Sequence, residues 1–313
     1  MYDTIDFRLT TGDAGGVDFL QETPCFLDEG TIGFHDYSGE QIVTGSIGNL
    51  KVSINKFQVK IKNGSLCKWH MGDNFKTMGR SDVQKAIEQL SDTLHLPMDK
   101  ATVTRIDVAQ NFIMQHPADV YFNHLGALNH SKRIQEPDGL YYTKGTGRLC
   151  FYDKNMEQKS KGETIPDLYQ NRNVLRYEQR WKKRVAAQFK VSKVTGASLY
   201  DEGFYMGVIQ RWRDTYKAIQ KINDITFNFK AMTGKQQLYK MGILSLVEHV
   251  GGETEMINHI SEAQKKGELT NKQAYDLRQA IINACSCGGG LTVQNEAITE
   301  LDKKIAEAAR FYR

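Results

Sequence analysis

Three segments of the chain alternate between apolar and polar residues with a period of two, which is the pattern of a β-strand with one polar face. In 103–112, one face would carry Val103, Arg105, Asp107, Ala109 and Asn111. In 174–182, it would carry Arg176, Glu178, Arg180 and Lys182. In 149–154, it would carry Cys150, Tyr152 and Lys154. The opposite faces are mostly apolar, so we expect each strand to cover a hydrophobic core on one side.

The polar faces of these strands hold residues suited to phosphate chemistry. If the strands are neighbours in one sheet, Asp107, Glu178, Tyr152 and Lys154 can converge. Two carboxylates near one phosphate repel it unless a cation lies between them, and Mg²⁺ or Mn²⁺ prefers such oxygen ligands. A tyrosine oxygen could then attack the phosphate, helped by a cation because the ordinary pKa of tyrosine is about 10. The spacing alone also fits an antiparallel sheet whose exposed face is merely charged, which is common.

The rest of the chain divides into a mixed part and a helical part. The first 70 residues are β-rich, and a helix is expected to start at Ser81 and to end before Pro97. A short helix over 118–128, a hairpin joined by Gly-Thr-Gly at 145–147 and a helix over about 203–222 follow. From Gly234 onward the apolar spacing is helical, with glycine runs as separators. We therefore predict an α+β domain over 1–232 and an all-helical C-terminal domain over 233–313, which binds DNA or serves packing or dimerisation.

A basic segment lies within the mixed part. Residues 172–193 contain eight Lys or Arg residues and one acidic residue, Glu178, interleaved with Tyr177, Trp181 and Phe189. Basic side chains attract phosphates, and flat side chains stack on unpaired bases. A solvated helix face could also produce such a run. We favour nucleic-acid binding by this segment.

The overall composition limits the class of protein. The chain has 313 residues, a formal net charge of +4 and 25% charged residues, which is normal for a globular protein. It has no apolar run long enough to span a membrane, and its first residues do not resemble a signal peptide. Five irregularly spaced cysteines suit a reducing compartment. We expect a cytoplasmic protein, acting in a bacterial host cell and without a membrane partner.

Four segments carry a resemblance to a known family. They are 48–91, VTRIDVAQNF (103–112), RLCFYDKNMEQ (148–158) and VLRYEQRWKKR (174–184). Together they resemble the gene II/X type of phage and plasmid replication initiator. The order R-I-D, Y-x-K-x-x-E and R-Y-E is also similar to that of the Rep_trans class of rolling-circle plasmid initiators. The resemblance covers about residues 45–215. It implies a central antiparallel sheet flanked by helices, as in the HUH nickases, but without their His-x-His metal pair, which is absent from the sequence.

The resemblance also implies an activity and roles for residues. It implies a metal-dependent nickase that cuts one DNA strand at an origin, stays joined to the 5′ phosphate through a tyrosine and later rejoins the strand. The matching nucleophile is Tyr152, and the matching Mg²⁺ or Mn²⁺ ligands are Asp107 and Glu178. Glu157 would be a further ligand or a base in the closing step, and Lys154 would bind the phosphate or stabilise the phenolate. The expected DNA-binding residues are Arg105, Arg176, Arg180, Lys182, Lys183 and Arg184.

Several alternatives stay open at the level of sequence. Tyr200 and Tyr205 follow the basic segment and are competing nucleophiles. A relaxase that mobilises a conjugative element would use the same chemistry as a replication initiator. A non-catalytic origin-binding protein would not need Tyr152, Asp107 and Glu178 at these places. The expected partners are origin DNA, as a single strand or a hairpin, and a host helicase and polymerase. The oligomeric state is not readable.

Overall fold

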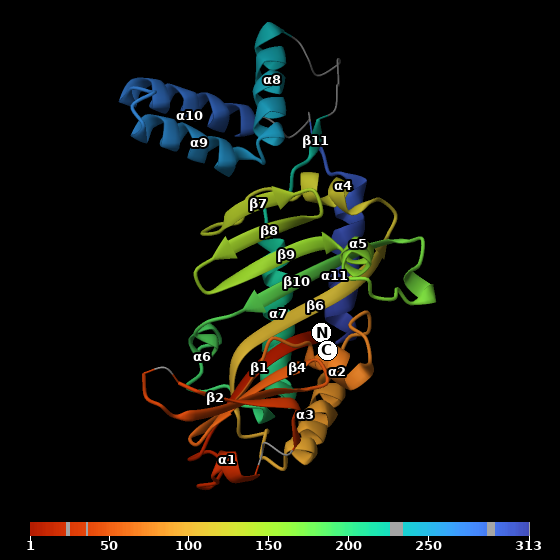
Figure 1. The fold of residues 1–313 in the computed structure, drawn as a ribbon. Helices are drawn as coiled ribbons and strands as arrows, with labels where there is room; N and C mark the ends of the chain where they lie inside the picture. Colours follow the sequence, from red (N-terminus) through yellow and green to blue (C-terminus); the bar gives the residue numbers. More distant parts are fainter. Residues whose placement is uncertain (23–25, 36, 226–233, 287–291, 313) are drawn as a thin grey trace.

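A computed structural model shows one large antiparallel sheet with helices on its faces (Figure 1). It describes residues 1–22, 26–35, 37–225, 234–286 and 292–312. Ten strands follow the order β2-β3-β4-β5-β1-β6-β10-β9-β8-β7. The strands are β1 (Tyr2–Thr10), β2 (Asp28–Phe34), β3 (Gln41–Ile47), β4 (Leu50–Asn55), β5 (Gln58–Lys62), β6 (Thr102–Met114), β7 (Lys132–Glu136), β8 (Gly139–Lys144), β9 (Gly147–Asp153) and β10 (Asn173–Trp181).

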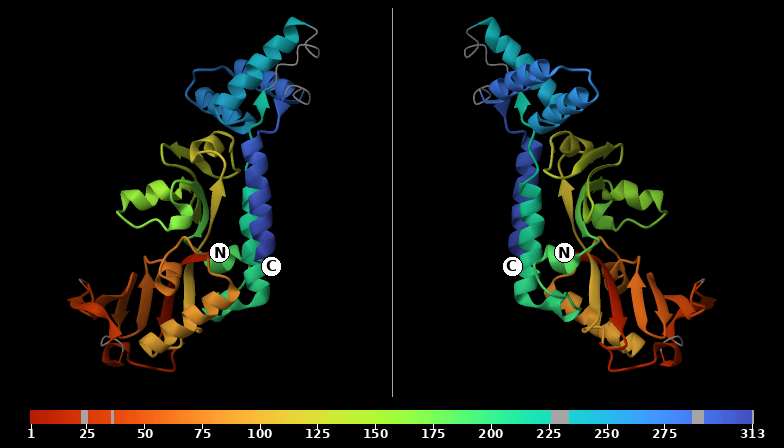
Figure 2. Two further views of the ribbon diagram at one scale, coloured as in Figure 1. Left: turned by 90° about the vertical axis from the view of Figure 1, so that its right-hand side faces the viewer. Right: turned by 90° about the vertical axis from the view of Figure 1, so that its left-hand side faces the viewer.

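Long helices cover the apolar face of the sheet. They are α3 (Arg80–Leu94), α7 (Glu202–Lys217) and α11 (Glu296–Phe311). The side views in Figure 2 show α7 and α11 next to each other along one face, and the short helix α5 (Lys154–Ser160) on the other side of the sheet. The expected α+β fold with a sheet flanked by helices is therefore confirmed.

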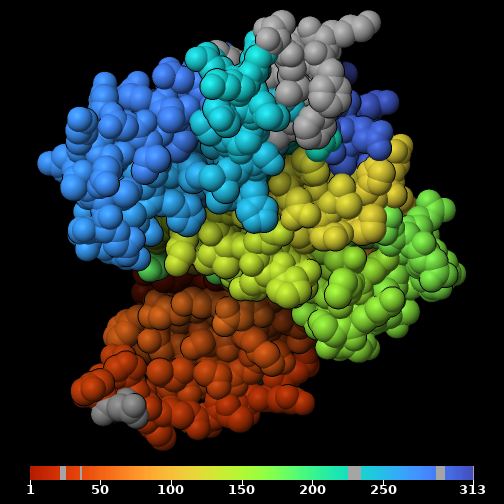
Figure 3. Space-filling view, turned by 90° about the horizontal axis from the view of Figure 1, so that it is seen from above, coloured from red at the N-terminus to blue at the C-terminus, as the bar shows by residue number. Residues whose placement is uncertain are grey.

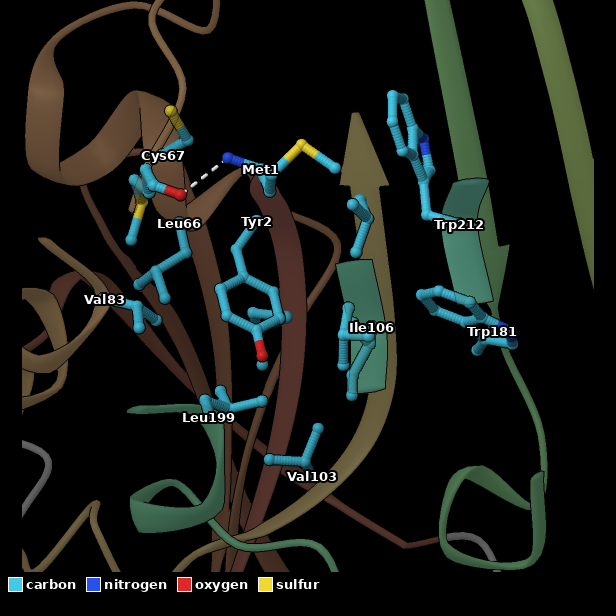
Figure 4. Close-up of a cluster of buried hydrophobic side chains, with 14 of the residues drawn as sticks. Met1, Tyr2, Leu66, Cys67, Val83, Val103, Ile106, Trp181, Leu199 and Trp212 are labelled. Carbon is cyan, nitrogen blue, oxygen red and sulfur yellow. Dashed lines mark hydrogen bonds between the residues drawn. The ribbon is translucent and has the colours of Figure 1, made fainter. Parts of the chain in front are cut away.

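The core lies between this face and the long helices. Phe151 on β9 stacks on Tyr177 on β10, with ring centroids 4.6 Å apart, and Tyr177 in turn stacks on Trp212 of α7 at 4.7 Å. The Tyr177 hydroxyl donates a hydrogen bond to the Trp212 carbonyl (2.9 Å). At the other end of the core, Val103 and Ile106 of β6 lie near Tyr2 (Figure 4). These contacts fix which face of β6, β9 and β10 points to the core, and so leave the other face free for polar residues.

Several local expectations are corrected. Helix α3 begins at Arg80 after a Gly79 N-cap, not at Ser81, because the Asp82 carboxylate caps the Gly79 amide. Val103 lies in the core and not on the polar face, because an extra residue in β6 shifts its register with β1 between Val103 and Arg105. The helix expected over 118–128 is α4 (Ala118–Asn123), and the helix expected over 203–222 is α7, which ends at Lys217.

The helices after residue 233 pack in two different places. Helices α8 (Lys235–His249), α9 (Glu253–Lys265) and α10 (Asn271–Ser286) pack on one another at the top of Figure 1. Their buried residues form two small clusters of their own. Helix α11 instead joins the core of the sheet through Ile298, Leu301 and Ile305. The predicted boundary between residues 232 and 233 lies outside the described residues and stays a prediction. None of the helices described in the structure has the length and apolar character that spanning a membrane requires.

This packing makes the last helix important for the stability of the sheet. Leu301 is fully buried between α11 and the sheet layer, so Leu301→Ala should lower the free energy of unfolding by about 2–5 kcal/mol. Leu246 on α8 is half exposed, and Leu246→Ala should change it by less than about 0.5 kcal/mol. Urea denaturation of both variants measures the difference. Equal effects would show that α11 does not contribute to the main core.

Candidate active site

The three polar strand faces predicted from the sequence lie side by side. Strand β10 pairs with β6 on one edge and with β9 on the other. In this register Arg180 lies opposite Asp107, and Arg176 lies opposite Tyr152. Side chains of residues paired in this way point to the same face of a sheet. The expected convergence of Asp107, Glu178 and Tyr152 is therefore confirmed.

Glu178 is the centre of this group. Its side chain is 3% exposed and has three partners. The Tyr152 hydroxyl donates a hydrogen bond to Oε2 (3.0 Å), Arg180 Nε donates to Oε1 (2.7 Å), and Arg176 Nε lies 3.5 Å from Oε2. Burial alone would raise the pKa of Glu178, but the charges of Arg180 and Arg176 outweigh it and lower the pKa. Glu178 is thus an ionised acceptor in contact with the tyrosine.

Asp107 is the second buried carboxylate. Arg105 Nε donates to its Oδ1 (2.9 Å), and Arg180 Nε lies 3.9 Å from its Oδ2. Arg180 therefore lies between the carboxylates of Asp107 and Glu178. Burial, followed by repulsion from Glu178, raises the pKa of Asp107 to about 7. A further cation near this pair would favour the ionised form of Asp107.

The two carboxylates fit part of a Mg²⁺ or Mn²⁺ site. They are oxygen donors on neighbouring strands, and burial, followed by the repulsion between them, makes Asp107 hold its proton more tightly. Among the described residues, no group of three or more His, Cys, Asp or Glu side chains is placed to hold a metal ion. Asp107 and Glu178 would therefore need water and substrate oxygens to complete the coordination.

Tyr152 lies next to the last residue of β9 and lines a cleft of about 410 Å³. The cleft is also lined by residues of the N-terminal strands and the loop after them, such as Asp3 and Asn63, and by Arg105 and Arg180 beside the two carboxylates. The hollow between the red-to-orange N-terminal part and the green part of the chain is visible in Figure 3. Burial raises the pKa of Tyr152 well above its ordinary value, while the charge of Arg176 acts in the opposite direction. The tyrosine is therefore neutral when the cleft holds no further cation.

Lys154 was expected on the strand with Tyr152, but it lies on the helix that follows. Strand β9 ends at Asp153, whose side chain accepts a hydrogen bond from the Met156 amide (2.9 Å) and so caps α5. Lys154 is the first residue of this helix and is fully buried, with its ammonium 2.7 Å from Glu157 Oε2. Glu157 lines the cleft and also pairs with Lys161. Lys154 itself does not line the cleft, but its partner Glu157 does.

The expected DNA-binding residues fall into three places. Arg105 and Arg180 line the cleft. Lys182, Lys183 and Arg184 are exposed, directly after β10. Arg176, however, is 1% exposed, and its partners are all inside the protein, so the expected contact with DNA is not available to it in this structure.

Arg176 instead holds the site together. Its Nη2 lies 2.9 Å from Asp3 Oδ2, and its Nη1 donates to Asn111 Oδ1 (3.1 Å) and to the Asn74 carbonyl (3.0 Å). The Ser65 hydroxyl donates to the other oxygen of Asp3 (2.6 Å). Asp3 was missed by sequence reasoning, because its partner is distant in the chain. Alternation along the first strand would place Asp3 on the core face with Ile5 and Phe7, and the irregular pairing with β6 between Tyr2 and Ile5 could not be read from the sequence.

The competing tyrosines lie elsewhere. Tyr205 is buried in the hydrophobic core, with its ring 5.7 Å from that of Tyr2. Tyr200 ends a short 3-10 helix (Ala197–Tyr200) and packs against the same core. Neither residue lines the cleft that contains Tyr152.

A comparison with protein families agrees with this geometry. The model of a family of replication-associated proteins, described as the N-terminal part of the phage gene II protein, matches residues 1–199. The chain belongs to this family. The match covers β1 to β10, and so includes all residues of the cleft named above. The resemblance to gene II-type phage replication initiators is therefore confirmed, and membership of the family supports a role in the initiation of replication. A search of curated proteins found no match to the chain.

Proposed function

We propose that this member of the gene II protein family is a rolling-circle replication initiator that cuts and rejoins one strand of origin DNA through Tyr152. The observation that carries the proposal is the tyrosine hydroxyl in a polar cleft, 3.0 Å from a buried carboxylate that two arginines hold. A protein that only binds DNA does not need a buried tyrosine–glutamate contact in its binding cleft.

The proposed reaction exchanges one phosphate ester for another. The Tyr152 hydroxyl, oriented by its hydrogen bond to Glu178, loses its proton to water as its oxygen attacks the phosphorus. The bond between phosphorus and the 3′ oxygen breaks, and the 3′ oxygen takes a proton from water. The 5′ phosphate stays on Tyr152. Attack by a 3′ hydroxyl on this phosphotyrosine reverses the exchange and joins the strand, and we propose Glu157 as the base of that closing step.

Basic side chains in the cleft would stabilise the charge that develops on the phosphate. Arg105 and Arg180 line the cleft and are partly exposed, so both can reach a bound phosphodiester. Arg176 and Lys154 are buried and act as positioning residues, through Glu178 and Glu157 respectively. Asp107 and Glu178 would hold Mg²⁺ or Mn²⁺, which supplies Lewis-acid activation of the phosphate when bound. The exposed Lys182, Lys183 and Arg184 would bind flanking DNA.

A test of the metal ligands does not depend on catalysis. Asp107→Asn should weaken Mn²⁺ binding by at least about 10-fold, because an amide is a poorer ligand than a carboxylate and removes one negative charge. In the unchanged protein, Mn²⁺ affinity should increase as the pH rises through about 7, because Asp107 then loses its proton. Calorimetric titration measures both effects. Asp6→Asn is a matched control, since Asp6 is a buried carboxylate on the same face outside the cleft. Equal losses in the two variants would contradict the assignment.

The proposed function is tested with supercoiled plasmid DNA that carries the origin region of the parent element. The protein with Mg²⁺ should convert it to open circles and, in part, to relaxed closed circles, because the cut strand is rejoined. Hydrolytic nicking without rejoining would contradict the covalent reaction. A relaxase would behave in the same way, and replication in cells that depends on the protein separates the two roles. A helicase and a polymerase stay predicted partners.

A further inference from the structure

Two pairs of like charges lie directly opposite each other in the N-terminal half of the sheet. Lys51 on β4 is paired with Lys62 on β5, and Arg8 on β1 is paired with Lys60 on β5. Like charges in directly opposed positions destabilise an antiparallel sheet. Two such pairs next to each other indicate that these cations serve something other than the fold. We call Lys51, Lys60 and Lys62 the lysine track.

The lysine track is on the same face of the sheet as the candidate active site. Arg105 on β6 lines the cleft and lies opposite Asp6 on β1. Arg8 is two residues after Asp6 on β1 and is therefore on the same face. Arg8 then lies opposite Lys60. Asp6 is an acidic residue among these cations: burial raises its pKa, and the charges of Arg105, Lys62 and Lys182 act in the opposite direction. Arg8, Lys60, Lys62 and Arg105 thus form a row of cations along this face, with Asp6 among them.

In the part of the chain that the structure describes, no salt bridge involves Lys51, Lys60 or Lys62. All three line a second cleft of about 430 Å³. Asp28 and Glu29 also line it, and Asp28 accepts a hydrogen bond from the Gly48 amide (3.1 Å). The other polar groups of this cleft are mainly hydroxyls and amides that can contact phosphate: Thr31, Thr44, Ser46, Ser53 and Asn63.

The second cleft continues the first one. Asn63 lines both, directly after Lys62 at the end of β5. Strand β5 is separated from β9 by β1, β6 and β10, which places the track about 19 Å from Tyr152 at the usual spacing between strands. A chain that has one phosphate at Tyr152 and runs along the sheet face would thus place phosphates several nucleotides further along near the lysines.

We propose that the lysine track binds the phosphates of the single DNA strand that flanks the cut phosphodiester. This inference rests on the proposed function, because it uses Tyr152 to place the cut. Charge complementarity and the continuity of the two clefts carry it. It assigns a DNA-binding role to residues that lie outside the basic segment 172–193, in the half of the sheet that holds none of the proposed catalytic residues.

The test measures DNA binding without cleavage. The full chain with Tyr152→Phe is titrated, without divalent metal, with oligothymidylates of roughly 4 and roughly 16 nucleotides, the limits of the site sizes found on single-strand-binding folds. Adding Lys51→Ala, Lys60→Ala and Lys62→Ala should weaken binding of the longer oligomer by at least about 10-fold at low salt. The slope of the logarithm of the binding constant against the logarithm of the salt concentration should become less steep by about 2. Binding of the shorter oligomer should change less, because it cannot contact the cleft of Tyr152 and the track at the same time.

Two further sets of variants separate the track from a general effect of charge. Lys85 on α3, Lys217 on α7 and Lys100 in the connection between α3 and β6 are exposed and line neither cleft, and their change to alanine removes the same charge. This control should leave the binding of both oligomers almost unchanged. Changing the three track lysines to arginine should keep the binding of the longer one. Lys51→Glu should raise the Tm, because it turns a repulsive pair into an attractive one, and still weaken DNA binding.

The outcomes are distinct from those of the proposed function. Equal losses in the track and control variants, or equal losses for both oligomer lengths, would overturn the track as a path for the flanking strand. A length-dependent loss supports it even if the protein fails to nick plasmid DNA, since no cleavage is measured here. If the protein nicks plasmid DNA but the change of the three track lysines to alanine leaves DNA binding unaffected, the proposed function stands and only this inference fails.

Discussion

Tyr152→Phe should reduce nicking of origin DNA by roughly 10³-fold or more, because it removes the attacking oxygen and leaves the rest of the cleft in place. The ring of Tyr152 stays, and Glu178 keeps its contacts with Arg180 and Arg176. The loss of one hydrogen bond to a charged group should lower the free energy of unfolding by about 1–3 kcal/mol. DNA binding should stay close to that of the unchanged protein. Gel analysis of plasmid forms over time measures the rate.

Tyr205→Phe is the matched control for this variant. The Tyr205 hydroxyl is buried and has no hydrogen-bond partner among the described residues, so its removal should leave stability unchanged or slightly increased. Nicking should continue at the original rate. If Tyr205→Phe stops nicking and Tyr152→Phe does not, the reaction centre is not in the cleft described above.

Arg176→Met should lower the free energy of unfolding by about 3–5 kcal/mol, because it leaves the carboxylates of Asp3 and Glu178 buried without their shared cation. Arg176→Lys keeps the charge but cannot reach Asp3, Glu178 and Asn111 at once, so we expect an intermediate loss. Denaturant unfolding of the purified variants measures both values. This is the effect expected of a positioning residue.

Lys183→Met distinguishes this structural effect from loss of DNA binding. Lys183 is exposed in the same basic segment, so its replacement should leave stability within about 0.5 kcal/mol and weaken DNA binding, most strongly at low salt. If Arg176→Met retains full stability and loses only affinity for DNA, the Arg176 guanidinium contacts DNA. The buried arrangement of Arg176 with Asp3 and Glu178 would then not be the arrangement that binds DNA.

The contrast between Arg176 and Lys183 shows what the sequence could and could not predict. The alternation of polar residues in β6, β9 and β10 is a local property, so the polar faces and the convergence of Tyr152, Asp107 and Glu178 were predictable. The burial of Arg176 depends on Asp3, which is far away in sequence and lies on a strand across the sheet. Periodicity assigns a residue to a face, but it does not tell whether a second part of the chain closes over that face.

The end of β9 and the last helix illustrate the same limit. The strand pattern of 149–154 continues through Lys154, but the Asp153 cap starts a helix there, and an aspartate three residues before Met156 was an available signal for it. The helical spacing of 296–311 correctly predicted a helix. It could not tell that α11 packs against the sheet while α8, α9 and α10 pack on one another, because an amphipathic helix fits either apolar surface.

The most direct test of the central claim is covalent capture of the tyrosine. The protein is mixed with Mn²⁺ and a labelled single strand from the origin region, digested, and the modified peptide is identified by mass spectrometry. We predict a nucleotide on Tyr152, joined through the 5′ phosphate. A nucleotide on Tyr200 or Tyr205, or cleavage of the strand without any protein adduct, would contradict the account.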